Sequence, residues 1–385
     1  MTEAKGIDPG ATPAESIGEP KWRRRRVRGC LLGGAIGDAL GAPVEFLTHS
    51  QILAKFGPRG ITDYAPAYGR IGAITDDTQI TLFTAEGLIR AMVRERLRGI
   101  VSVPSVLSHA YLRWLLTQGE SPTHTSLEVF QDGWLWGVAG LQARRAPGTT
   151  CLAALRAMRR FTDERANNQS KGAGGIMRVA PIACIVGDGS ADMAEEVFAL
   201  AKQAAWLTHG HPTGYLAAAA FAVIVHALLW DMELDDGVER ARRLLTAEKG
   251  SGETLAAITA GMAHSALDTG ASNTNVIASL GEGWVAEEAL SIALFCVRQE
   301  RDFLPAVRLA INHGGDSDTT GSLVGQMIGA RDGEHALPPG LRERLELREV
   351  IETIADDLTD ALAWDLNDDE HPDVVEALWR KYPGV

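Results

Sequence analysis

"GCLLGGAIGDALGAPVEF", residues 29–46, places glycines at helical spacing inside an apolar segment. Gly33, Gly37 and Gly41 recur every four residues, with Gly34 beside them, and residues four apart lie on one face of a helix. Because glycine has no Cβ, a backbone or a ligand can approach this face closely. A dinucleotide-binding GxGxxG loop would need a preceding strand. The sequence before residue 29 predicts none, so we exclude that fold.

The rest of the chain has a helical pattern almost throughout. Apolar residues recur at i, i+3 and i+4 in the segments 78–97, 105–118 and 284–299, which is the period of an amphipathic helix. The stretches "ITDYAP" (61–66) and "IACIV" (182–186) are the only weak strand candidates. We therefore predict a single large all-α domain with little or no sheet. The most apolar run, 214–230, falls short of the roughly 20 apolar residues that span a bilayer, so we expect a buried core helix.

Composition argues against several classes of protein. The 385 residues include 37 basic and 50 acidic side chains, a formal net charge of −13, which argues against nucleic-acid binding. No segment predicts a membrane span or a signal peptide. The four cysteines are scattered and form no CxxC pair. We therefore expect neither a disulfide framework nor a thiolate zinc site, and a reducing cytoplasm is the natural setting.

The two ends of the chain differ from its middle. Residues 1–27 are predicted to be a disordered extension, followed by one domain over 28–385 with a C-terminal tail at 365–385. The run Arg23–Arg26 is either a solvated first helical turn or a docking surface for an acidic partner. A last helix in the tail is expected to pack through Trp379.

Two clusters of threonine and aspartate precede apolar helices, at 75–77 and at 316–319. An aspartate at a helix start commonly caps the orphan N–H groups, but a cap explains one aspartate and not two. If the clusters converge, four carboxylates share one place and repel each other. Either some are then protonated or a cation lies between them. Oxygen donors without His or Cys suit Mg²⁺ or Mn²⁺, and four aspartates could bridge a pair of ions.

Other segments carry weaker signals. Asp38 and Glu45 lie among apolar residues of the glycine-rich segment, and Asp38 could simply cap a helix. The glycine-rich loop after Ser170 either exposes N–H groups to a phosphate or only connects helices. His209 and His211 are either ligand-binding groups or packed core residues.

The strings "GAIGDALGAPVEF", "ITDDTQITL", "SKGAGGIMRVAP", "LTHGHP", "GEGWVAEEAL" and "NHGGDSDTTGSLVGQMIGA" occur in this order. Together they resemble the ADP-ribosylglycohydrolase family, which includes the dinitrogenase reductase-activating glycohydrolase and the ADP-ribosylarginine hydrolases. The resemblance covers roughly residues 28–362. It implies a large orthogonal helical bundle with a site for two divalent cations, Mg²⁺ or Mn²⁺.

The resemblance also assigns roles to residues. It implies metal ligands at Thr75, Asp76, Asp77, Asp316, Asp318 and Thr319. It implies three catalytic residues: Glu45, which matches a glutamate near the metals, and the ligands Asp76 and Asp316. Substrate binding falls on Ser170, Lys171, Gly172 and Gly174, which would hold the diphosphate of ADP-ribose, and on His209, on the adenosine-ribose side.

The implied activity is the removal of ADP-ribose from modified protein side chains. "SKGAGG" is closer to the arginine-linked branch of the family, so we expect an ADP-ribosylated arginine protein as substrate. Two all-α enzyme alternatives fit poorly, because Ile80 occupies the third aspartate position of a prenyl-diphosphate DDxxD motif and no His-Asp pair occurs for an HD phosphohydrolase.

Two alternatives of another kind remain. One is an immunity protein that binds a cognate ADP-ribosyltransferase toxin through residues 1–27, with or without hydrolysis. The other is a homologue that has lost catalysis, which is disfavoured because each implied ligand position holds a competent residue.

Overall fold

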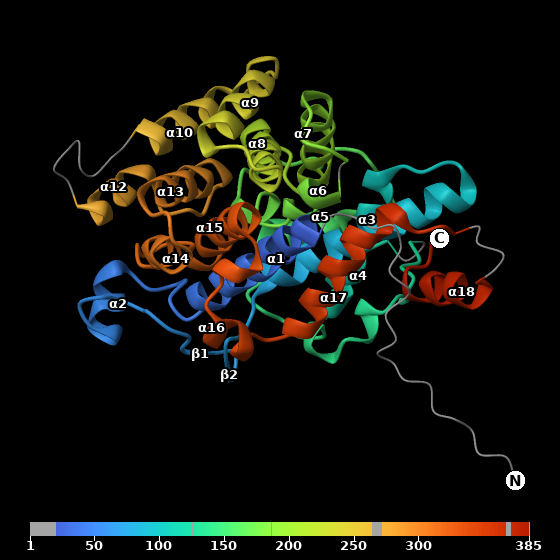
Figure 1. Cartoon of the computed structure of the whole chain (residues 1–385), viewed down its shortest axis with the longest axis horizontal. Coiled ribbons are helices and arrows are strands. Elements are labelled where there is room, and N and C mark those ends of the chain that lie inside the picture. Colours follow the sequence, from blue (N-terminus) through green and yellow to red (C-terminus); the bar gives the residue numbers. More distant parts are fainter. Residues whose placement is uncertain (1–20, 125–126, 186, 264–271, 367–370, 385) are drawn as a thin grey trace, which may run out of the picture.

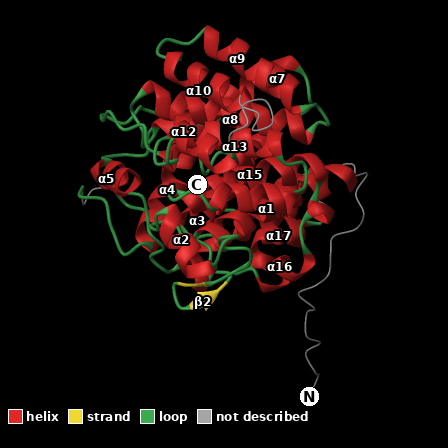
Figure 2. Ribbon diagram, turned by 90° about the vertical axis from the view of Figure 1, so that its left-hand side faces the viewer, coloured by secondary structure: helices red, strands yellow, loops and turns green. Residues whose placement is uncertain are grey.

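The computed structural model describes residues 21–124, 127–185, 187–263, 272–366 and 371–384. Within these ranges nearly every element is a helix (Figure 2), which confirms the predicted all-α class. The first half contains α1 (Lys21–Gly41), α2 (His49–Phe56), α3 (Asp76–Arg98), α4 (Val103–Thr117), α5 (Thr149–Ala157), α6 (Ala180–Ile185) and α7 (Ala191–Trp206). The second half contains α8 (Pro212–Leu229), α9 (Leu234–Thr246), α10 (Gly252–Ala263), α12 (Asn273–Leu280), α13 (Ala286–Gln299), α14 (Phe303–Ile311), α15 (Ser317–Asp332), α16 (Pro339–Arg344), α17 (Arg348–Asp360) and α18 (Pro372–Lys381).

The remaining regular elements are short. Strands β1 (Pro66–Ala67) and β2 (Arg70–Ile71) form a small antiparallel hairpin at one edge of the molecule (Figure 1). Single turns of 3₁₀ helix occur at η1 (Leu135–Gly137), η2 (Ala139–Leu141), η3 (Ala173–Gly175), η4 (Glu334–Ala336) and η5 (Ala361–Ala363). The predicted strand at 182–186 is wrong, because residues 180–185 form α6. A short apolar run has no period that separates a buried helix from a strand.

Helices α1 and α15 lie against each other near the centre of the fold (Figure 1). Their glycines face each other in antiparallel order: a Cβ on Gly33 would lie 2.3 Å from the carbonyl oxygen of Gly325. A Cβ on Gly37 would lie 2.0 Å from that of Gly321. Such distances are impossible for a real side chain, so both helices need glycine where their backbones meet. The close approach predicted for residues 29–46 is therefore made by a backbone.

Helix α8 passes through the core beside α7, α9 and α13. It is the one helix in the described ranges whose length and apolar composition would suit a membrane span, yet 94% of that window is buried inside the fold. The segment is therefore a core helix, as its sequence predicts. Its neighbours bury it on every side, so it carries almost no polar face.

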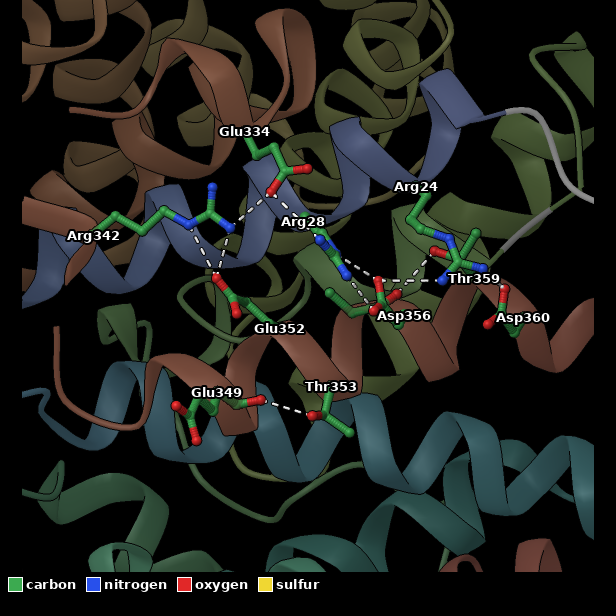
Figure 3. Close-up of polar contacts among 11 residues, drawn as sticks. Arg24, Arg28, Glu334, Arg342, Glu349, Glu352, Thr353, Asp356, Thr359 and Asp360 are labelled. Atoms are coloured by element: carbon green, nitrogen blue, oxygen red, sulfur yellow. Dashed lines mark hydrogen bonds and ion pairs between the residues drawn. The ribbon is translucent and has the colours of Figure 1, made fainter. Parts of the chain in front are cut away.

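The arginine run belongs to α1, which begins at Lys21, so residues 21–27 are part of the folded domain. Figure 3 shows Arg24 and Arg28 directed at carboxylates of α17, and Arg28 Nε donates to Asp356 Oδ1 at 2.6 Å. Arg24 pairs with Asp360. Arg26 donates to the Leu229 carbonyl at 3.0 Å.

These contacts hold the start of α1 onto α17 and onto the end of α8. The arginine run is therefore neither a solvated helical turn nor a free docking surface. Within it, Arg25 is exposed. The predicted disorder of residues 1–20 falls outside the described residues.

The C-terminal helix α18 does not pack through Trp379, which is 45% exposed. The tail is held instead by Tyr382, which is buried and whose hydroxyl donates to Asp357 Oδ2 at 2.5 Å. The sequence pattern pointed to the larger aromatic ring, but the register of the last turn buries the residue after the helix.

His226, in the buried helix α8, makes the stability of the fold sensitive to acid. Burial lowers the pKa of this imidazole to about 4, whereas an unfolded histidine titrates near 6.5. The unfolded state therefore binds the proton first, and stability is lost as the pH falls from about 6.5 towards 4. Between pH 7 and pH 5 this group should remove roughly 2 kcal/mol from the free energy of unfolding.

Urea unfolding of His226→Leu and of the wild type at pH 7 and pH 5 measures the contribution of His226 to the pH dependence of the free energy of unfolding. The variant should lose less stability than the wild type between the two pH values. The same substitution at His335, which is exposed, should leave the pH dependence as it is. Equal losses in His226→Leu and the wild type would contradict the assignment.

Candidate functional site

The start of α3 meets the end of α1 through a buried carboxylate. Asp38 Oδ2 accepts hydrogen bonds from the backbone N–H of Thr75 at 3.0 Å and from that of Thr78 at 3.2 Å. Asp38 thus caps α3 from another helix, as one interpretation of the sequence allowed. Because α1 is fixed against α15, this cap ties the positions of α3, α1 and α15 together.

The aspartates in the first turn of α3 are not used as caps of that helix. Thr75 is the N-cap, and its Oγ1 accepts from the N–H of Asp77 at 3.3 Å. Asp76 Oδ2 accepts from the N–H of Gly148 at 3.1 Å. Asp77 Oδ1 is buried without a hydrogen-bond partner, which is costly for a carboxylate unless a cation or a proton compensates.

The second cluster opens α15. Asp316 occupies the N-cap position without a side-chain cap, and its N–H donates to the Glu282 carbonyl at 2.8 Å. Asp318 Oδ1 accepts from the N–H of Thr319 at 2.9 Å. The hydroxyls of Ser317 and Thr320 donate to carbonyls of the preceding turn. Local structure therefore occupies these two hydroxyls and leaves the Asp316 carboxylate without a capping role.

Both clusters open into one cavity of about 350 Å³. Five acidic residues line it: Glu45, Asp76, Asp77, Asp316 and Asp318. Thr319, His209 and two glycines of the glycine-rich loop, Gly172 and Gly174, also line it. Phe46 and Trp284 also line it and are exposed, and their rings stack with centroids 6.0 Å apart. The predicted convergence of the two aspartate clusters is therefore present in the fold, although Thr75 lies behind the lining.

The carboxylates in this cavity share an unfavourable environment for negative charge. Burial first, and then the charge of Asp318, raise the pKa of Asp76, Asp77 and Asp316 well above its ordinary value. The same two causes raise the pKa of Glu45 to about 11, and Glu45 Oε2 is buried without a partner. Groups in this state favour uptake of protons or of a cation. Among the described residues, no three His, Cys, Asp or Glu side chains are already arranged around a single point as metal ligands.

The glycine-rich loop is held by the segment that carries Trp284. The N–H of Ala173 donates to the Trp284 carbonyl at 3.1 Å, and the N–H of Ala286 donates to the Lys171 carbonyl at 2.8 Å. The Lys171 ammonium pairs with Glu253 at 2.8 Å and with Glu287, and its side chain is not part of the cavity lining.

The remaining predicted site residues lie close by. Ser170 Oγ lies 3.0 Å from Thr150 Oγ1 and accepts from the N–H of Gly172 at 3.3 Å, so it shapes the loop from outside the cavity lining. His209 lines the cavity. His211 caps α8 instead, because its Nδ1 accepts from the N–H of Thr213 at 3.2 Å.

Some lining residues have no signal in the local sequence. Gly148 and Cys151 come from the segment before and within α5, and Gly148 acts only through its backbone. Phe46 and Trp284 stand within the quoted strings "GAIGDALGAPVEF" and "GEGWVAEEAL", but only the fold shows that both are exposed at one cavity. The one sequence signal for Phe46 is its position directly after Glu45.

Comparisons with known proteins show which family this chain resembles over most of its length. The model of the ADP-ribosylglycohydrolase family matches residues 19–367. The chain is 26% identical to the ADP-ribosyl-[dinitrogen reductase] glycohydrolase of Rhodospirillum rubrum, over 84% of this chain and 91% of that one. It is 24% identical to the ADP-ribosylarginine hydrolase Tri1 of Pseudomonas putida, over 90% and 85% of the two chains.

The fold gives the same result. A solved structure described as an ADP-ribosylglycohydrolase-related protein complex superimposes with a TM-score of 0.64 at 26% identity, covering 89% of this chain and 99% of the other. Because the family match spans nearly all of the described domain and the cavity gathers the predicted acidic clusters, this chain belongs to the ADP-ribosylglycohydrolase family.

Proposed function

We propose that the protein hydrolyses the bond between ADP-ribose and an arginine side chain of a modified protein, with the help of two divalent cations. The observation that carries the proposal is the single cavity that joins acidic residues from the starts of α3 and α15 to the loop at Gly172 and Gly174. Backbone N–H groups of such a loop suit a diphosphate, and clustered carboxylates suit hard cations. ADP-ribose offers both a diphosphate for such a loop and a ribose that metal ions can bind.

The residues present fit a pair of Mg²⁺ or Mn²⁺ ions. All candidate donors are oxygen atoms, from Thr75, Asp76, Asp77, Asp316, Asp318 and Thr319. Asp77 Oδ1 is buried and unpartnered, and burial, followed by the charge of Asp318, raises the pKa of Asp76 and Asp316. Among the described residues, no three of these carboxylates are already arranged as ligands of one ion. The ligand set would therefore have to include the threonine hydroxyls, or the aspartate side chains would have to rotate slightly.

Cleavage of a glycosidic bond builds positive charge on the ribose, which carboxylates nearby stabilise. Two bound cations would supply the charge that lowers the pKa of a water and polarises the substrate. Glu45 lines the cavity with a buried, unpartnered Oε2, which would be a suitable atom to accept a proton from a water that attacks the ribose. Its raised pKa means that it carries a proton at neutral pH until positive charge enters the cavity.

The arginine linkage rests on two sequence-level observations. The loop reads "SKGAGG", as in the arginine-linked branch, and one relative is named an ADP-ribosylarginine hydrolase. The partner in this proposal is an ADP-ribosylated protein. Capture of a toxin by residues 1–27 stays a prediction without structural support, because most of the arginine run is bound to the chain itself and residues 1–20 lie outside the described ranges.

An assay for free ADP-ribose tests the proposal. Protein ADP-ribosylated on arginine is incubated with the enzyme and Mg²⁺ or Mn²⁺, with a serine-linked substrate in parallel. We expect release from the arginine substrate, loss of at least about 100-fold in rate with a chelator because several kcal/mol of cation stabilisation disappear, and recovery when the metal returns. Release that persists in chelator would contradict metal dependence. Faster release from serine would contradict the linkage, and no release from either would contradict the function.

A further inference from the structure

His209 stands at the end of a chain of buried polar groups that the proposed reaction does not use. Arg178 is fully buried, stacks over the ring of Tyr111 at 4.2 Å, and donates through Nη2 to the Ala204 carbonyl at 3.0 Å and to Thr208 Oγ1 at 2.6 Å. Thr208 Oγ1 in turn lies 2.8 Å from Nδ1 of His209. A series of hydrogen bonds therefore connects the buried guanidinium of Arg178, through the hydroxyl of Thr208, to the imidazole of His209 in the cavity wall.

The hydroxyl of Thr208 decides which way the hydrogen bonds point. A hydroxyl has one proton and two lone pairs, and Arg178 already donates into one lone pair. The proton can go to His209 Nδ1 at 2.8 Å, to the Ala205 carbonyl at 3.4 Å, or to the thiol sulfur of Cys151, which is only a weak acceptor. The second contact is long for an O–H donor. A cation that donates to the oxygen also makes its proton more acidic and its remaining lone pair weaker, so Thr208 donates to Nδ1.

An imidazole that accepts at Nδ1 carries its own proton on Nε2 when it is neutral. Burial, and then the charge of Arg178, lower the pKa of His209 to about 3, so the ring is neutral at physiological pH. Nε2 lies on the side of the glycine-rich loop, because a Cβ on Gly172 or on Gly174 would be 3.5 Å from it. A fixed N–H donor therefore faces the loop that lines the cavity.

We propose that Arg178 and Thr208 are positioning residues that hold His209 as a neutral Nε2–H donor to an oxygen atom of ADP-ribose bound at the Gly172–Gly174 loop. The identity of the ligand rests on the proposed function, whereas the tautomer rests on the geometry of the ligand-free chain. The assignment explains why a fully buried arginine lies behind the cavity wall without lining it. Its hydrogen bond to the hydroxyl of Thr208 links it to the His209 ring in the cavity wall.

The tautomer is tested first, without ligand, by ¹⁵N-edited NMR of the histidine rings at pH 7. His209→Gln identifies the signals of His209 among those of the ten histidines. We expect the wild-type ring to be neutral, with its proton on Nε2 only. A proton on Nδ1, or a charged ring, would overturn the proposal whatever the enzyme hydrolyses.

The role in binding is tested with ADP-ribose itself by calorimetry in Mg²⁺ or Mn²⁺. Thr208→Val keeps the shape of the side chain but removes the hydroxyl, so we expect mixed tautomer signals and a Kd weaker by roughly tenfold, the value of one neutral hydrogen bond. Thr208→Ser restores the hydroxyl and should restore both the single tautomer and most of the affinity. Equal weakening in the valine and serine variants, or none in the valine variant, would overturn the positioning role.

A matched control separates this role from general destabilisation. Thr359→Val makes the same change at a buried threonine of α17, whose hydroxyl donates to the Ala355 carbonyl of the same helix at 2.9 Å. Thr359 does not line the cavity, so this variant should bind ADP-ribose as the wild type does. If Thr208→Val does not fold, the wild-type spectra and the serine variant still decide. If the wild type itself binds no ADP-ribose, the proposed function fails together with this ligand assignment, while the spectra still settle the tautomer.

Discussion

Asp316→Asn is expected to remove almost all hydrolysis of ADP-ribosyl-arginine while the fold stays intact. Asp316 lines the cavity at the start of α15, where burial and the charge of Asp318 raise its pKa. Loss of an anionic ligand should cost several kcal/mol of cation-based stabilisation of the transition state, roughly 10³-fold in kcat. Asparagine keeps the shape and is neutral at a position where burial and the charge of Asp318 already disfavour the ionised carboxylate. The free energy of unfolding without metal should therefore not fall.

Two measurements check this expectation: kcat with saturating Mg²⁺ or Mn²⁺, and urea unfolding in a chelator. Asp76→Asn, in the first turn of α3, should behave in the same way. Asp235→Asn is the control, because Asp235 is an exposed residue of α9 that pairs with Arg298 at 2.8 Å, and its turnover should equal that of the wild type. A kcat for Asp316→Asn within tenfold of the wild-type value would show that its carboxylate is not a ligand of a catalytic ion.

Much of the fold could be predicted from local pattern, because helical periodicity is a local property. The periodic segments 78–97, 105–118 and 284–299 correspond to α3, α4 and α13 within a few residues. The sequence does not predict the pairing of α1 with α15, although Gly321, Gly325 and Gly329 repeat the four-residue spacing of the glycines in α1. Glycine spacing identifies a helix face without side chains, but only the tertiary fold shows which other helix packs against that face.

In the candidate site too, local sequence predicts some features and only the tertiary fold shows the others. The pairs of neighbouring aspartates stood out because a helix cap needs only one of them, and the fold brings both pairs to one cavity. The contribution of Gly148 is a backbone N–H, which no side-chain pattern can reveal. The hydrogen bond from Arg178 to Thr208 joins segments thirty residues apart. Local sequence therefore does not show that these two residues are connected.

Gly37→Ala should destabilise the whole domain, although alanine is the better helix former by about 1 kcal/mol. The new Cβ would lie 2.0 Å from the carbonyl oxygen of Gly321 and 2.9 Å from the backbone nitrogen of Ser322. Backbone atoms in the middle of α15 cannot rotate away as a side chain can, so the two helices must separate. Overpacking of a core costs about 1–3 kcal/mol when side chains can adjust, and here we expect a loss of at least about 3 kcal/mol, at or above that range.

Urea unfolding measures that loss, and Gly340→Ala is its control, because a Cβ on Gly340 meets nothing within 4 Å and should be neutral or slightly stabilising. Activity should fall further than stability alone explains. Asp38 follows Gly37 on α1 and holds the start of α3 through Thr75, while Asp318 stands on α15. Any separation of α1 from α15 therefore moves one aspartate cluster away from the other. A folded Gly37→Ala variant with wild-type kcat would contradict the idea that this glycine contact sets the spacing of the site.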